Sequence, residues 1–299
     1  MKKVIFLVFS MAFSWFHFTA VAQFNSKEIT RVIQTLAADS MMGRMSGTKY
    51  ADMAAQFIAA ELGTAGLKPL PGQKDLMQTF QVSNSQIESI SGSVEGHPIQ
   101  MDQVMVVSSS KQLQLNQVSC NFSWVAKGDN VGEKVFGLDR TLGDHVIFMD
   151  TSFKKIFGRL QKMKLETMPG EGSLVIMLAT AIPATFDFKV QNTIQTKTFM
   201  NVGGMITGKR KDEYVLFSGH YDHIGIGKPV EGDSIFNGAN DDASGTTAVI
   251  ALAKYFGSQK EKPERTILFA TFTAEESGGF GSKYFSRQLN PDQVVAMFN

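Results

Sequence analysis

Cysteine is almost absent from this 299-residue sequence, in which Cys120 is the only one. A single cysteine cannot form a disulfide within the chain, so the fold must be stabilised by a hydrophobic core, by bound metal, or by both. A charge excess of one sign is also lacking, because 29 basic and 28 acidic residues leave a net charge of +1. No overall field attracts an anionic polymer or an anionic membrane, so no nucleic-acid partner is predicted.

A short apolar run opens the sequence. Two lysines precede the apolar residues 4–18, and the small residues Ala20-Val21-Ala22 follow. The run is shorter than the ~20 apolar residues of a membrane-spanning helix and polar residues interrupt it, which favours a cleaved signal over an anchor. We predict that residues 1–22 are a signal peptide and that the mature chain is secreted or periplasmic, with no stable membrane anchor. The oligomeric state is left open.

Helical periodicity is typical of the first part of the chain, and strand patterns follow it. Apolar residues at helical spacing predict a helix from Ser26 and a second one from about Lys49. From about Val82 the segments become short, and alternating polarity predicts strands. The strands predicted there cover residues 101–108, 118–126, 144–150 and 173–180, with one helix over 153–164. We therefore expect a mainly β module, residues 85–198, inserted into a domain formed by residues 23–84 and 199–299.

The last third of the sequence alternates between strand and helix. Residues 214–219 and 266–274 are continuously apolar, and helices are predicted from about Ser244 and over 281–289. Strands that are apolar on both faces are typical of a sheet covered by helices on two sides. The expected fold is therefore α/β, with a mixed, largely parallel sheet. Ligands of such sheets bind beyond the carboxyl ends of the strands.

Histidine and acidic residues stand at those strand ends. His220, Asp241 and Glu276 are residue types that bind zinc, and the two oxygens of Asp241 suit it to bridge two ions. Asp222, two residues after His220, can orient the imidazole. Glu275 can act as a general base toward water. The pattern therefore predicts a two-metal hydrolytic centre.

Each of these residues also has a plainer interpretation. His220 alone could be a hydrogen-bonded core histidine, Asp241 and its neighbour could cap a helix, and Glu275-Glu276 could be favourable charge at a helix start. Their joint position at one edge of a single sheet favours the site. For His223 a structural or rim role is preferred.

Three segments, SGHYDHIG, NGANDDASG and FTAEESGGFGS, resemble the signature segments of the di-zinc aminopeptidase family, and residues 36–70 resemble its helical start. The family includes secreted bacterial aminopeptidases and has relatives among glutamate carboxypeptidases, glutaminyl cyclases and the transferrin receptor. The resemblance implies two zinc ions, ligand roles for His220 and Glu276, a bridging role for Asp241 and a base role for Glu275. It also implies a cis peptide after Asp241 and a peptide substrate. The middle of the chain resembles a divergent protease-associated domain.

The sequence departs from the family pattern near its end. The family uses a further acidic ligand and a further histidine, but no histidine follows His223 and the last acidic residue is Asp292. Residues 294–299 begin as a strand. We therefore expect the 299 residues to be the amino-terminal piece of a longer hydrolase, with little activity of its own.

The function expected of the whole protein is that of a secreted metal-dependent exopeptidase that hydrolyses amino-terminal residues from peptides. One alternative is a glutaminyl cyclase-like acyltransferase, which typically uses a single zinc. Another is a non-catalytic binding protein of the same fold. A phosphate- or nucleotide-binding α/β protein ranks last, because the loops lack a lysine-bearing phosphate motif.

The signal peptide predicts a defined mature amino terminus. Expression of the full reading frame in a secreting host should give a soluble chain that starts at Gln23, because Ala20-Val21-Ala22 supplies the small residues of a cleavage site. Intact mass measurement of the purified chain tests this prediction. An uncleaved chain in the membrane fraction would contradict it.

Overall fold

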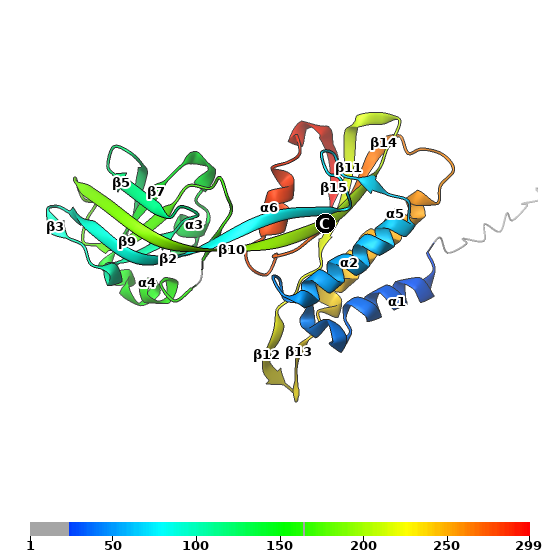
Figure 1. Ribbon diagram of the computed structural model, residues 1–299, viewed down its shortest axis with the longest axis horizontal. Coiled ribbons are helices and arrows are strands. Elements are labelled where there is room, and N and C mark those ends of the chain that lie inside the picture. The colour runs from blue at the N-terminus through cyan, green and yellow to red at the C-terminus, as the bar shows by residue number, and fades with distance from the viewer. Residues whose placement is uncertain (1–23, 164) are drawn as a thin grey trace, which may run out of the picture.

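The computed structural model describes residues 24–163 and 165–299, so the predicted signal peptide lies outside the described residues. Two lobes lie side by side, and two long strands run from one lobe into the other (Figure 1). Within the described ranges, no helix is long and apolar enough to cross a membrane.

A mixed sheet forms the centre of the first lobe and extends into the second lobe through β2 and β10 (Figure 1). Its strand order is β15-β11-β14-β10-β2-β3, with the short strands β1, β5 and β8 paired to β10 or β2. The strands of this order are Val294–Phe298 (β15), Arg210–His220 (β11), Arg265–Phe272 (β14), Phe186–Ile206 (β10), Met77–Val94 (β2) and His97–Pro98 (β3). The pairs β11–β14 and β11–β15 are parallel, whereas β10 is antiparallel to both β14 and β2. The short strands are Lys68–Pro69 (β1), Gln112–Asn116 (β5) and Glu166–Thr167 (β8).

Helices cover both faces of this sheet. On one face, α1 (Ser26–Leu36), α2 (Lys49–Thr64) and α5 (Ser244–Gly257) pack against β10 and β14 around the fully buried side chains of Leu36, Ile58 and Phe269. On the other face, α6 (Phe280–Ser286) places Phe285 against β11 and β14. The apolar residues at helical spacing therefore form the helix faces that pack on the sheet, as expected of amphipathic helices.

The second lobe has its own sheet and its own core. The strands Val104–Val107 (β4), Leu174–Ala179 (β9), His145–Asp150 (β7) and Asn121–Val125 (β6) are ordered β4-β9-β7-β6. Two short helices, Val131–Phe136 (α3) and Lys154–Leu160 (α4), cover one face, and β5 with the far ends of β2 and β10 covers the other. A hairpin of Gly225–Val230 (β12) and Asp233–Phe236 (β13) projects from the first lobe (Figure 1).

The α/β class and the mixed sheet covered by helices are confirmed. In this sheet the parallel pairs are β15–β11 and β11–β14, and in the sheet of the second lobe they are β6–β7 and β7–β9. The expectation of short segments after Val82 is wrong, because β2 and β10 have 18 and 21 residues and pair from Met77–Val202 to Val94–Phe186. The helix α3 was not predicted, whereas α1 begins at Ser26 as predicted, with Asn25 as its cap. Both long strands run through the predicted domain boundaries, so the division into domains stays a prediction.

Arg44 joins three segments beneath the carboxyl edge of the sheet. Its side chain is fully buried and donates to the carbonyl oxygens of Leu36, Tyr221, Asn237 and Gly238. Burial lowers the pKa of Arg44 to about 10, although the negative charges of nearby aspartates act to raise it. The guanidinium therefore stays charged at neutral pH. The end of α1, the loop after β11 and the loop before α5 are thereby held together.

Replacing Arg44 with methionine, which has no donor, should lower the free energy of unfolding by about 3 kcal/mol or more. The reason is that several buried carbonyl groups would lose their partners, and each unsatisfied buried group costs about 1–3 kcal/mol. Urea denaturation measures the loss, with the exposed Arg159→Met as a matched control expected to stay within about 0.5 kcal/mol of the parent. Equal stability of the two variants would contradict the bracing role of Arg44.

Candidate metal centre

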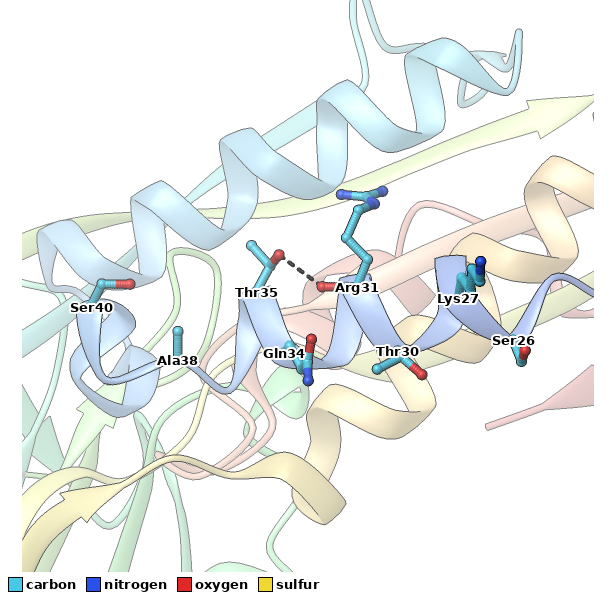
Figure 2. A pocket seen from close by; sticks show the side chains of 8 residues that line it. All are labelled: Ser26, Lys27, Thr30, Arg31, Gln34, Thr35, Ala38 and Ser40. Carbon is cyan, nitrogen blue, oxygen red and sulfur yellow. Dashed lines mark hydrogen bonds between the residues drawn. The ribbon is translucent and has the colours of Figure 1, made fainter.

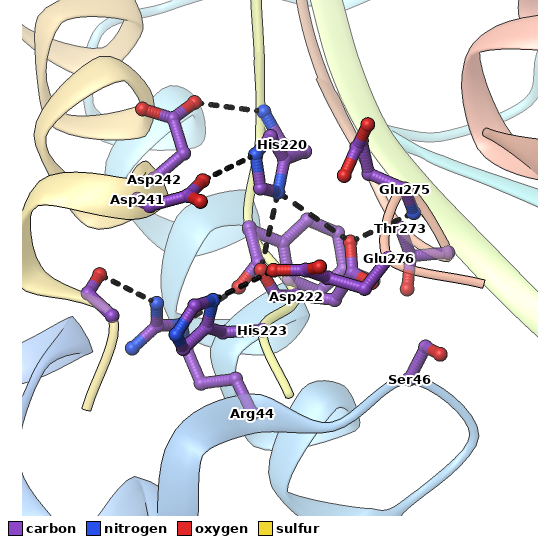
Figure 3. A network of polar contacts seen from close by, with 12 residues as sticks. Arg44, Ser46, His220, Asp222, His223, Asp241, Asp242, Thr273, Glu275 and Glu276 are labelled. Carbon is purple, nitrogen blue, oxygen red and sulfur yellow. Dashed lines mark hydrogen bonds and ion pairs between the residues drawn. The ribbon is translucent and has the colours of Figure 1, made fainter. Parts of the chain in front are cut away.

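Parallel pairing of β11 and β14 brings the predicted site residues to one edge. His220 ends β11 and is in register with Phe272, which ends β14. The loop after β11 carries Asp222, and the turn after β14 carries Glu275 and Glu276. The segment before α5 adds Asp241 to the same cluster (Figure 3).

His220 faces the carboxylate of Asp241. The imidazole Nε2 lies 3.0 Å from Oδ1 of Asp241, and Nδ1 lies 3.2 Å from the carbonyl oxygen of Asp222. A carbonyl oxygen can only accept, so Nδ1 carries a proton and donates it. In the neutral imidazole, Nε2 then presents a lone pair to a carboxylate oxygen. Two acceptors at this distance require a shared proton or a cation between them.

Asp222 connects the two strand ends from beneath. Its side chain is fully buried, and Oδ1 accepts the backbone N–H of Glu275 at 3.1 Å. The same oxygen lies 3.8 Å from Nδ1 of His220, while Oδ2 has no hydrogen-bond partner. Burial raises the pKa of Asp222 to about 6. The predicted orienting role of Asp222 therefore has a geometric basis, although its backbone carbonyl makes the closer contact with the imidazole.

Asp241 and Asp242 have different environments although they are adjacent. The peptide bond between them is cis, as the family resemblance implies. Asp242 accepts the backbone N–H of His220 at 3.1 Å and that of Gly245 at 2.8 Å. The helix-capping interpretation thus fits Asp242, whereas the side chain of Asp241 is 64% exposed and free to bind a ligand. A Cβ at Gly245 would lie 2.3 Å from Asp242, so this position requires glycine.

Glu276 is paired with His223, a contact that the predicted structural or rim role did not anticipate. Nδ1 of His223 lies 2.8 Å from Oε1 of Glu276. His223, Asp241 and Glu276 each offer one ligand atom, and these atoms all lie within 4.8 Å of one another. His223 directly follows Asp222 and lies three residues after His220. This spacing gave no sequence signal for a ligand role, because His223 reaches the cluster through the path of the loop.

Glu275 is exposed at the same edge. Among the described residues its carboxylate makes no hydrogen bond or ion pair, so it is open to solvent. The turn that carries it is fixed by hydrogen bonds of its backbone. The N–H of Thr273 donates to Oδ1 of Asn201 at 3.2 Å, and the N–H of Phe280 donates to the carbonyl oxygen of Ala274 at 3.1 Å.

A cavity of about 860 Å³ lies beside Glu276, between the two lobes. Glu276, Ser277 and Gly278 line one side of it, and Leu138 and Met163 belong to the side formed by the second lobe. Glu171 of the second lobe and Arg287 next to α6 form an ion pair of 2.9 Å within the lining. This volume is in the range of small-ligand sites. A separate hollow of about 620 Å³ runs along α1 and contains none of the candidate residues (Figure 2).

The comparisons with known proteins agree with the motifs. Residues 201–299 match the sequence profile of Peptidase family M28. Aminopeptidase NAALADL1 of Mus musculus is 32% identical over 116 residues, which are 36% of this chain and 14% of that protein. The probable leucine aminopeptidase 2 of Aspergillus oryzae is 29% identical over 124 residues, 42% of this chain and 23% of that protein. The chain thus spans less than a third of these relatives' length.

Solved structures with a related arrangement include an aminopeptidase from Aneurinibacillus sp. strain AM-1, with a TM-score of 0.48 and 16% identity over 92% of this chain and 70% of that one. A glutaminyl cyclase from Porphyromonas gingivalis gives a TM-score of 0.41 and 14% identity over 93% and 60% of the two chains. The resemblance carried by the three motifs is confirmed, because residues 201–299, which contain all three, are similar to peptidase family M28.

Proposed function

We propose that this chain is the metal-binding part of a secreted zinc exopeptidase that removes amino-terminal residues from peptides. The observation that carries the proposal is the contact between Nε2 of His220 and the exposed carboxylate of Asp241, with Glu276 beside them. Since the chain spans only part of its relatives, the activity, the secretion and the peptide substrate of the whole protein all belong to the proposal.

The residues present fit zinc. One imidazole nitrogen and two carboxylates are the nitrogen and oxygen donors that zinc binds, and Nε2 of His220 lies 3.0 Å from an oxygen of Asp241. His220, Asp241 and Glu276 would hold the metal, and the two oxygens of Asp241 let it serve two ions. When bound, zinc supplies a Lewis acid and lowers the pKa of water.

The other residues would act on protons and on position. The free carboxylate of Glu275 would take a proton from the attacking water and return it to the leaving amine. Asp222 would keep the base near the metal ligands, because it accepts the N–H of Glu275 and contacts the ring of His220. The cavity beside Glu276 has room for the rest of a short peptide.

The first test combines zinc content with turnover of an aminoacyl chromogenic substrate, on this chain and on the product of any reading frame that continues past Asn299. The proposal requires zinc binding and release of the amino-terminal residue by at least one of the two. Binding of one zinc with cyclisation of amino-terminal glutamine would instead identify an acyltransferase. Absence of both zinc and turnover would favour a binding protein of the same fold.

Glu275→Gln in the active form should lower turnover by about 10²–10⁴-fold, because the amide cannot accept the proton. Zinc content should stay the same, since the carboxylate of Glu275 lies outside the cluster of ligand atoms. The exposed Glu133→Gln in the second lobe is the matched control, with full turnover expected. Loss of zinc from the Glu275 variant would refute the assignment as base.

Asp241→Ala should remove all bound zinc, because this carboxylate lies against both His220 and the pair formed by His223 and Glu276. Atomic emission gives the zinc content per chain, and the exposed Asp52→Ala on α2 is the control that should keep it. A variant at position 241 that retains one zinc would show that the carboxylate is not shared.

A further inference from the structure

We propose that His223 is itself a metal ligand, so that His223, Asp241 and Glu276 form one ion subsite and His220 with Asp241 forms the other. The inference deepens the proposed function by adding a ligand that the motifs did not assign. It rests on the metal centre of that function and is independent of peptide hydrolysis.

The donor atoms of the three side chains are close enough for one ion. They lie within 4.8 Å of one another, and Nδ1 of His223 is 2.8 Å from Glu276. Zinc binds such donors at ~2.0–2.2 Å, so the carboxylates of Asp241 and Glu276, which are exposed, would move closer to the imidazole to share one ion. One nitrogen and two oxygens match the histidine and carboxylate sets that zinc accepts.

The position of His223 is fixed by its surroundings. Its backbone N–H donates to the carbonyl oxygen of Arg44 at 3.3 Å, and the residue forms a parallel bridge with Met45. Its ring packs on Gly238, where a Cβ would lie 2.7 Å from two ring carbons. Because the side chain of His223 is only 13% exposed, few rotamers remain open to it. The imidazole is therefore held toward the cluster before any ion binds.

A weaker role would leave His223 as a hydrogen-bond donor that orients Glu276. Partners of this kind typically change metal affinity by 10–100-fold when they are lost. The two roles predict different behaviour for asparagine at position 223. Its amide can donate to Glu276 from nearly the position of Nδ1, but it does not supply the nitrogen lone pair that a zinc ligand needs.

The test is zinc titration of the metal-free chain by calorimetry, with His223→Ala, His223→Asn and the exposed His97→Ala as a control. A ligand role predicts that both variants at position 223 lose more than about 100-fold in affinity at one subsite, beyond the range of an orienting partner. The His97 variant should match the parent. Circular dichroism checks that all variants are folded.

A second measurement observes the imidazole directly. In the chain labelled with ¹⁵N-histidine, one ring nitrogen of His223 should shift on zinc saturation, and the signal is assigned by its loss in the His223 variants. Unchanged ring nitrogens, or an asparagine variant that keeps parental affinity, would overturn the proposal. If neither subsite binds zinc in the parent chain, both the proposed metal centre and the ligand role of His223 are refuted. If zinc binds without peptide hydrolysis, the proposed activity is refuted, and the titration still tests the ligand role of His223.

Discussion

Parallel hydrogen bonding between β11 and β14 is the constraint on which the candidate centre depends. The register that places His220 opposite Phe272 sends the loop after β11 and the turn after β14 out of the sheet at the same edge. The carboxylate of Asp222 then joins them by accepting the N–H of Glu275. The third segment is joined through Asp242, which accepts the N–H of His220. Backbone groups thus fix the loops, and the side chains that face one another remain available for a ligand.

The carboxylates of the centre divide into two groups by their hydrogen bonds. Asp222 and Asp242 accept backbone N–H groups and belong to the framework, whereas Asp241, Glu275 and Glu276 are exposed at the edge. Several negative charges so close together repel one another unless a cation compensates them. The buried guanidinium of Arg44 supplies one positive charge from below, but its donors are all directed at carbonyl oxygens. A cation bound between the exposed carboxylates would therefore be electrostatically favourable.

Local sequence patterns predicted what depends on local structure. The apolar residues 266–274 and 214–219 correspond to β14 and β11, and the motifs at their ends do converge. The long strands β2 and β10 were missed because polar residues fill much of residues 83–93, and their extended form depends on pairing with each other and with neighbouring strands. The burial of Arg44 and the approach of His223 to Glu276 depend on how distant loops pack. No periodicity encodes such contacts.

The continuity of β2 and β10 also bears on what can reach the centre. The antiparallel pairing of these two strands continues from the first lobe into the second. Along β2 and β10, the lobes are therefore joined by paired strands and not by a flexible linker. The ion pair between Glu171 and Arg287 adds a direct contact between them beside the cavity. A molecule that approaches Glu276 from this side must therefore lie against side chains of the second lobe, such as Leu138 and Met163. The second lobe contributes its own wall to the centre, so its side chains limit the size and the polarity of what fits.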